Sequence, residues 1–478
     1  MATNRHFAPR LSPLEAWSFS LGGIIGWGVF VMPGNTFLPT GGPVGTATAF
    51  CVSAVVMVVI ALNLHYMMNR FPVAGGAFIY AKNTFGHTHG FICGWFLALA
   101  YLAIIPQNAT ALALISRNLM GGILEVGPSY NIAGYDTYLS EMVLVALVLA
   151  VLALMAIRST KAVGIAQAVF ASCLVVGVSI IVITIAMSPA AATANLEPSF
   201  APEIPPLMGT VGIMVIAPWA FVGFEMITQL SEDIRFSPRW AGLIMGLAIG
   251  AGAIIYIAMN FSAITVLPPG YADWSAYIND LPNLNGLESL PAFYAVHQVM
   301  GPVGLLVLGL ATIGAVFTCI ICFALGISRL LFAMALEGAL PAWFGQLHAR
   351  YGTPANTLIC VFAVSFALAF LGRSVLSWIV DVSSVGASIA FLYASLATMR
   401  TATREGKTTW RIAGAFGVVM SGLFIALLFV PIAGLNNTHD MGSYVLLVTW
   451  AVLGVNLFTP EFKSSPTQIS QIPDDIDH

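Results

Sequence analysis

Two carboxylates stand inside long apolar segments of this sequence. Glu225 lies well inside an apolar run over 207–231, and Asp381 lies within Ile379-Val380-Asp381-Val382. A charge at the centre of a bilayer costs roughly 2.5–3.5 kcal/mol on insertion scales, so a carboxylate kept there is a functional candidate. We therefore interpret both as candidate proton-coupling residues. Two alternatives stay open: Glu225 forms a hydrogen-bonded lock between helices, and Asp381 lies near the outer interface and is hydrated.

A second pattern concerns glycine and proline within apolar runs. Residues 21–30 read Leu-Gly-Gly-Ile-Ile-Gly-Trp-Gly-Val-Phe, and residues 217–225 read Ala-Pro-Trp-Ala-Phe-Val-Gly-Phe-Glu. Such stretches weaken a helix. Small residues can also simply let helices pack closely, but two such stretches in comparable places favour two interrupted helices. Unwound backbone at membrane depth is tolerated where it lines a cavity, and its free amide and carbonyl groups suit a zwitterion.

Other polar and aromatic side chains could line such a cavity. Gln107 and Asn108 are adjacent in an apolar run, and Trp219 and Phe221 lie within the second stretch. Each has a structural alternative, because polar residues in membrane helices often bond a neighbouring helix and aromatic residues often only pack. Trp27 either shrinks the pocket or offers an indole face to a cation or an aromatic substrate.

The elements that must position these residues are membrane-spanning helices. Of the 478 residues, 59% are hydrophobic and only 8% are charged, which excludes an ordinary soluble domain. Runs of roughly 20 apolar residues predict twelve spanning helices, at residues 14–39, 44–69, 91–118, 138–157, 164–187, 207–231, 239–266, 302–335, 356–372, 376–399, 412–434 and 441–459. We expect a further short amphipathic helix within 70–90, re-entrant or at the membrane surface and not a span.

Basic residues predict the orientation. If the N-terminus is cytoplasmic, only Arg117 and Arg373 of the 17 lysines and arginines fall in outward loops. Because positive charge collects in cytoplasmic loops, we expect both termini to face the cytoplasm, in a multi-pass protein of the plasma (cell inner) membrane.

The positions of the two interrupted helices predict an all-α integral membrane fold with internal symmetry. Interruptions five spans apart fit a five-plus-five inverted repeat in which helices 1 and 6 are discontinuous. The expected regions are a cytoplasmic tail (1–13), a transport core (14–399) with halves 14–187 and 207–399, two additional helices (400–459) and a cytoplasmic tail (460–478).

Four motifs, in order, resemble those of the amino acid, polyamine and organocation (APC) transporter superfamily. They are Gly-Ile-Ile-Gly-Trp-Gly-Val-Phe at 23–30, Phe71-Pro72 with Gly75-Gly76, Phe221-Val222-Gly223-Phe224-Glu225 with Glu232, and Ser328-Arg329-Leu330-Leu331 with Glu337-Gly338. The resemblance implies the leucine-transporter type of fold, alternating access and an amino acid substrate. It implies that the substrate carboxylate meets the amides of Ile25, Gly26, Trp27 and Gly28, and that the ammonium meets carbonyls near Ile24, Phe221 and Val222. Trp27 departs from the small residue usual there, which leaves the substrate open.

The alternatives to an amino acid transporter are other kinds of membrane protein. A carrier of amines or polyamines of the same fold stays open, whereas a channel or a membrane-embedded enzyme is disfavoured because no polar rings or clustered catalytic groups appear. We expect no cofactor, no metal site and no nucleic acid partner, and we interpret Cys319 and Cys322 as packing residues. Thr318 and Ser328 are too far apart for the hydroxyl pair of sodium-coupled relatives, so proton symport or substrate exchange is expected. The substrate and the bilayer are the expected partners, and homo-oligomerisation is left open.

Overall fold

The N-terminal helix begins where the sequence provides a cap. In this computed structural model, which describes residues 7–458 apart from 121, 133–134 and 431–440, α1 spans Pro13–Ile24. The Ser12 hydroxyl accepts the Glu15 amide, and the Glu15 carboxylate accepts the Ser12 amide at 2.6 Å. This reciprocal capping satisfies two amides at the helix start, and Pro13 supplies a preset φ.

The first interruption lies within the glycine-rich stretch. Helix α1 ends at Ile24, the next three residues are not helical, and α2 (Gly28–Met32) resumes. It continues through a π-helical turn, η1 (Pro33–Phe37), into α3 (Leu38–Met68), which is kinked at Gly42 ahead of Pro43. The backbone at 25–27 is therefore open between two helical segments.

The second interruption falls in the segment that carries Glu225. Here α8 (Pro206–Val215) and α9 (Ala217–Phe221) precede a non-helical stretch, and α10 (Met226–Gln229) follows. Val222 is extended and Gly223 has a φ of 112°, a left-handed conformation that only glycine adopts without strain. The chain therefore turns sharply between Phe221 and Met226.

The two interrupted segments touch at a pair of glycines. A Cβ atom placed on Gly23 would lie 2.6 Å from the Gly223 Cα, and one placed on Gly223 would lie 2.5 Å from the Gly23 Cα. Both distances are shorter than any real carbon contact, so neither position tolerates a side chain. Bare backbone on both sides thus allows the segments to cross in direct contact.

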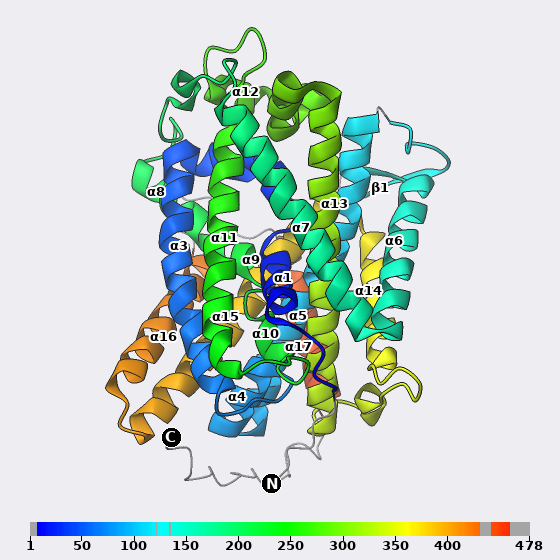
Figure 1. Cartoon of the computed structure of the whole chain (residues 1–478), viewed down its shortest axis with the longest axis vertical. Coiled ribbons are helices and arrows are strands. Elements are labelled where there is room, and N and C mark those ends of the chain that lie inside the picture. The colour runs from blue at the N-terminus through cyan, green and yellow to red at the C-terminus, as the bar shows by residue number, and fades with distance from the viewer. Residues whose placement is uncertain (1–6, 121, 133–134, 431–440, 459–478) are drawn as a thin grey trace.

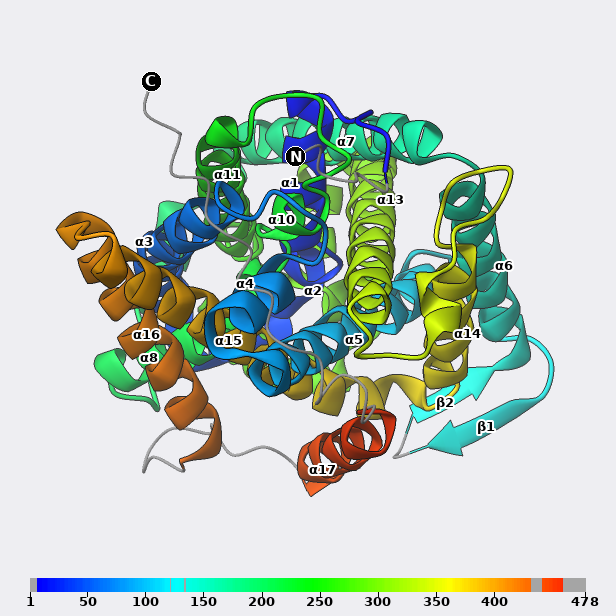
Figure 2. The same ribbon diagram turned by 90° about the horizontal axis from the view of Figure 1, so that it is seen from below.

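Longer helices surround this crossing (Figures 1 and 2). Helix α13 packs along α7 and α5, α15 packs along α5 and α16, and α11 packs against α1 and α3. Figure 2 shows α1 and α10 near the centre of the bundle and α6, α14, α16 and α17 around it. The surrounding helices are α5 (His87–Met120), α6 (Leu139–Arg158), α7 (Thr160–Ala186), α11 (Ala241–Ser262), α13 (Pro291–Leu336), α14 (Ala355–Ala369), α15 (Gly372–Arg404), α16 (Thr408–Phe429) and α17 (Met441–Leu457).

The outward faces of these helices are apolar. Leu147, Ile183, Val419 and Val448 have exposed fractions of 61%, 58%, 61% and 63%. Eight helices in the described part of the chain are long and apolar enough to cross a membrane, and α8, α14 and α17 are shorter apolar helices. Exposed apolar surface of this extent is suited to lipid and not to water.

The short helix expected in the 70–90 region forms, but it is not a surface helix. Helix α4 (Gly76–Phe85) forms there, but Gly76 to Lys82 are buried, and the helix packs against α5 and α15 instead of lying exposed at a surface. Lys82 pairs with Glu337, just beyond the end of α13, which allows its charge to lie against the protein. We call the end of the molecule where α4 lies, at the bottom of Figure 1, the α4 end.

The opposite end carries small elements. Strands β1 (Ser129–Ile132) and β2 (Tyr135–Tyr138) pair antiparallel, with Ser129 opposite Tyr138. This hairpin was not among the expectations for an all-α chain. Helix α12 (Trp274–Asp280) lies at the same end, capped by the Asp273 carboxylate. Short helical turns complete the loops: η2 (Thr193–Leu196), η3 (Pro238–Trp240), η4 (Leu281–Asn283), η5 (Gly286–Ser289) and η6 (Ala342–Gly345).

Candidate functional site

A small cavity lies against the first interruption. Its volume is 20 Å³, which leaves room for about one water molecule. It is lined by residues of α1 and α2, α5, α9, α11 and α13: Gly23, Ile24, Gly26, Trp27, Gly28, Ile104, Asn108, Trp219, Tyr256 and Cys319. None of these ten residues carries a charged side chain. The polar groups at the cavity are therefore backbone groups and the amide, hydroxyl, indole and thiol groups of side chains.

Asn108 on α5 holds the open backbone in place. Its Oδ1 accepts the Trp27 amide at 3.2 Å, while its Nδ2 donates to the Ile104 carbonyl at 3.0 Å and to the Cys319 sulfur at 3.2 Å. The Gly26 amide donates to no acceptor among the described residues. Gly28 opens α2, where amides lack an intrahelical acceptor. Backbone donors are thus presented at the cavity.

Tyr256 on α11 closes the other side. Its hydroxyl donates to the Ile24 carbonyl at 3.1 Å, and its ring stacks on Phe50 with the centroids 4.6 Å apart and the planes 9° apart. The Tyr256 bond satisfies the last carbonyl of α1. Trp219 of α9 lies over Gly28, because a Cβ on that glycine would be 2.9 Å from the indole. Aromatic rings therefore fill most of the space at this depth.

Glu225 is buried behind this cavity and does not line it. It is 2% exposed, and its carboxylate accepts the Gly223 amide at 2.8 Å and the Tyr101 hydroxyl at 2.9 Å. The carboxylate therefore ties the second interruption to α5. Both groups donate, so the acceptor-only form of the side chain fits this position without rearrangement.

Comparison with known proteins places this arrangement in a family. The family model for amino acid permeases matches residues 11–453. The chain belongs to the amino acid permease family. The APC resemblance read from the motifs is thereby confirmed, and the chain is a multi-pass membrane protein of a family of transporters.

Three similar proteins show the range of this family. The permease is 25% identical to the branched-chain amino acid permease of Lactococcus lactis subsp. cremoris, with 95% of each chain covered. It is 25% identical to an uncharacterized transporter of Mycobacterium tuberculosis (93% of this chain, 91% of that one). It is 23% identical to a low-affinity putrescine importer of Escherichia coli K12 (91% and 89%).

The permease brings some of the predicted substrate-binding residues together and not others. Ile24, Gly26, Trp27, Gly28, Asn108 and Trp219 line the cavity. Ile25, Gln107, Phe221 and Val222 do not. Phe221 instead packs edge-on against Phe50 at 6.0 Å, and the buried Gln107 amide has no hydrogen-bond partner among the described residues. Gly23, Ile104, Tyr256 and Cys319 line the cavity although the sequence analysis did not select them.

Asp381 lies elsewhere in the permease. It is partly buried on α15 and accepts the Ser443 hydroxyl of α17 at 2.8 Å. It does not line the cavity beside the first interruption. Cys319 does, which gives this residue a place at the cavity in addition to the packing role expected for it. Within the described ranges, no group of three or more His, Cys, Asp or Glu residues is arranged to hold a metal ion.

A buried ion pair lies in the permease between the cavity and the α4 end. Arg329 donates to Asp233 at 3.0 and 3.2 Å, and the two side chains are 1% and 2% exposed. Phe7 covers the guanidinium at 3.9 Å from its ring centre. Neighbouring Glu232 accepts the Phe7 amide at 3.3 Å and the Ala74 amide at 3.1 Å. We call these residues the Asp233–Arg329 lock.

The sequence did contain a signal for this lock. Charged residues make up only 8% of the chain, so an acidic pair directly after the second interruption and an arginine inside a long apolar helix are both unusual. Glu232 and Arg329 were expected only as motif residues, without partners. Asp233 and Arg329 are 96 residues apart in sequence, and no local spacing rule links such positions.

Proposed function

We propose that the permease moves an amino acid across the plasma membrane by alternating access, as a proton symporter or a substrate exchanger. The observation that carries this proposal is the cavity at the first interruption, which offers unpaired backbone amides and no charged side chain. A zwitterion brings both of its charges and can use amides for its carboxylate and carbonyls for its ammonium. The ten neutral lining residues suit such a substrate.

The proposal includes the membrane arrangement expected from the sequence. Twelve crossings would place α1–α2 and α8–α10 as the two discontinuous helices of an inverted repeat, over 14–187 and 207–399, with 400–459 as two additional helices. The α4 end would be cytoplasmic, together with both termini. Lys82 of α4 and Lys407 and Arg411 at the start of α16 support this, since these basic residues lie at one end.

The size of the cavity implies a closed conformation. A volume of 20 Å³ holds no amino acid, so Trp27, Trp219 or the surrounding helices must move before substrate enters. The Asp233–Arg329 lock would close the path toward the α4 end. Substrate entry would therefore begin from the opposite end, which fits a carrier that exposes its site to one side at a time.

An amine or polyamine carrier is the second candidate, since one relative is named a putrescine importer. Putrescine carries two positive charges and would need carboxylates that the cavity lining lacks. Glu225 is the nearest acidic candidate by its place on the second interruption, but both of its oxygens already accept hydrogen bonds.

A thermal-shift comparison of matched compounds tests the proposal. The purified permease would be heated with each α-amino acid, with the amine lacking its carboxylate and with the acid lacking its amine. A ligand at 100 times its Kd adds about 2.7 kcal/mol to the free energy of unfolding. We expect one or more amino acids to raise the melting temperature and their two fragments to leave it unchanged. Stabilisation by amines alone would replace the amino acid proposal with the amine alternative.

A further inference from the structure

A groove runs along the outer face of α15, away from the central cavity. Two adjoining hollows of 530 and 440 Å³ share Phe85 and Leu396, so they form one continuous groove. Residues of α15 line its floor three or four positions apart, from Ile389 to Arg404, which is the spacing of a single helix face. The groove therefore follows the helix axis.

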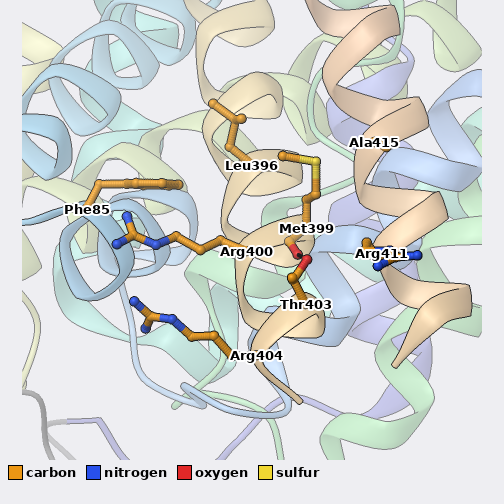
Figure 3. A pocket seen from close by; sticks show the side chains of 8 residues that line it. All are labelled: Phe85, Leu396, Met399, Arg400, Thr403, Arg404, Arg411 and Ala415. Atoms are coloured by element: carbon orange, nitrogen blue, oxygen red, sulfur yellow. Dashed lines mark hydrogen bonds between the residues drawn. The ribbon is translucent and has the colours of Figure 1, made fainter. Parts of the chain in front are cut away.

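Neighbouring helices form its two walls. Phe85 at the end of α4 and Ile92 on α5 stand on one side, and Ala415 on α16 stands on the other. Figure 3 shows Arg400 and Arg404 extending from α15 toward the Phe85 side, with Arg411 on the adjacent helix. The groove is thus open outward, apolar along most of its length and cationic at the α4 end.

The three arginines make no ion pair with a carboxylate in the part of the chain that the structure describes. All three are exposed, and Arg400 lies 5.2 Å from the centre of the Phe85 ring. The nearby Glu405 is already bound by Arg70, Lys407 and the Tyr66 hydroxyl. The Arg70 hydrogen bond lowers the pKa of Glu405 to about 2, so this carboxylate stays ionised and committed to other partners.

The groove length matches one leaflet of a bilayer. From Met399 to Ile389 the helix rises by about 15 Å, at 1.5 Å per residue. One leaflet contributes half of the ~30 Å hydrocarbon thickness. An acyl chain can therefore lie along the apolar floor while its phosphate stays at the arginines.

We propose that this groove is a binding site for an anionic diacyl phospholipid of the leaflet at the α4 end. Arg400 and Arg404, which extend toward the same Phe85 side, bind the phosphate, since guanidinium groups bind phosphate oxygens through paired, charge-assisted hydrogen bonds, and Arg411 on the adjacent helix adds positive charge at this end. One acyl chain packs against Leu396, Phe85 and Ile92. Charge complementarity and an apolar floor of leaflet length together specify this occupant.

Native mass spectrometry of the intact permease in detergent tests the proposal, with phosphatidylglycerol and phosphatidylcholine as probes. The triple variant Arg400→Gln, Arg404→Gln, Arg411→Gln removes the cationic end. Each basic residue near an anionic membrane contributes about 1 kcal/mol, so phosphatidylglycerol affinity should fall on the order of 100-fold. Equal binding by the wild type and this variant, or equal binding of the two lipids by the wild type, would overturn the proposal.

A matched control removes the same charge elsewhere at the α4 end. Arg158→Gln, Lys161→Gln, Arg350→Gln changes three exposed basic residues that do not line the groove. Phosphatidylglycerol binding should stay within about twofold of wild type, and melting curves confirm that all variants are folded. A loss as large as that of the groove variant would reduce the effect to net charge and refute a defined site.

A second variant separates lipid from other occupants. Leu396→Trp fills the floor without changing charge, and it should weaken phosphatidylglycerol binding at least tenfold. Water-soluble glycerol phosphate should not compete with the lipid. Competition at comparable concentration would make this an anion site. A dimer in the same spectra that Leu396→Trp disrupts, with lipid binding unaltered, would make it a protein interface.

Discussion

At the scale of single residues, we propose Glu225 as the proton-coupling group. Its carboxylate accepts two hydrogen bonds, from the Gly223 amide and the Tyr101 hydroxyl. Glutamine can keep both contacts, because its oxygen accepts the amide and its NH₂ group donates to the rotated Tyr101 hydroxyl. Glu225→Gln therefore removes titration while preserving the shape. If Glu225 carries or senses the proton, net uptake into proteoliposomes should lose its pH dependence, while substrate exchange continues.

Tyr101→Phe is the matched control. It removes one hydrogen bond to Glu225 and leaves the carboxylate able to titrate, so uptake should slow by no more than about tenfold, as expected for one hydrogen bond, and keep its pH profile. A wild-type pH profile in Glu225→Gln would show that Glu225 is a structural lock. Asp381 would then be the next residue to test, although its contact with Ser443 lies away from the cavity.

The site residues show how far sequence reasoning reaches at this scale. A place at the cavity could be predicted for Gly26, Trp27, Gly28 and Asn108, because these residue types are unusual in an apolar helix. Gln107 and Asn108 are adjacent, so their side chains point about 100° apart around the helix and only one can face the cavity. The sequence does not show which of the two faces it. Ile104, four residues before Asn108, shares its face. Tyr256 carried no signal, because tyrosine in a membrane helix has many ordinary roles.

At the scale of elements, Gly26 should be intolerant of any side chain. A Cβ there would lie 2.6 Å from the Asn108 Oδ1 and 3.3 Å from the Cys319 sulfur. Gly26→Ala would push Asn108 from the Trp27 amide, and leaving a buried donor unpaired costs about 1–3 kcal/mol. We expect at least tenfold weaker substrate binding, measured by the thermal shift at a fixed ligand concentration, and a complete loss in Gly26→Leu.

Gly250 on α11 provides the comparison, because nothing lies within 4 Å of the Cβ that alanine would add. Gly250→Ala should leave binding unchanged and slightly raise stability, since alanine favours a helix by up to about 1 kcal/mol over glycine. Wild-type binding by Gly26→Ala would mean that the glycines of the first interruption serve only packing.

Elements were predictable to the extent that the bilayer sets their length and composition. Each of the twelve expected ranges overlaps at least one observed helix. The sequence did not decide between a re-entrant and a surface position for α4, because an amphipathic pattern fits both. The pairing of Lys82 with Glu337 lets the helix lie inside. The β1–β2 hairpin was missed because four-residue strands in a loop leave almost no periodic pattern.

At the scale of the whole molecule, the Asp233–Arg329 lock should control access from the α4 end. Removing one partner of a buried ion pair costs about 3–5 kcal/mol. Asp233→Ala should therefore lower the melting temperature and favour conformations open at that end. Cys319 reports this directly, because it lines the cavity and lies about 15 Å from Arg329 along α13, at 1.5 Å per residue. Its labelling by a maleimide, followed by peptide mapping, should accelerate at least tenfold.

Glu405→Ala is the control for this experiment. It breaks the half-exposed Arg70–Glu405 pair at the same end, and pairs of this kind contribute about 0–1 kcal/mol. It should change neither Cys319 labelling nor the melting temperature appreciably. Unaltered Cys319 labelling in Asp233→Ala would show that the ion pair stabilises the fold without closing the path.

The contact between Gly23 and Gly223 constrains how this protein can change over generations. Packed neighbours usually exchange size: one side chain grows when its partner shrinks, so a pair can drift while its volume stays constant. Here each added carbon would meet the α-carbon of the other residue at 2.5–2.6 Å, and glycine has no smaller replacement. No second substitution at this contact can rescue the first. The crossing of the two interrupted segments is therefore closed to compensatory evolution, and divergence in substrate choice must come from the residues around it.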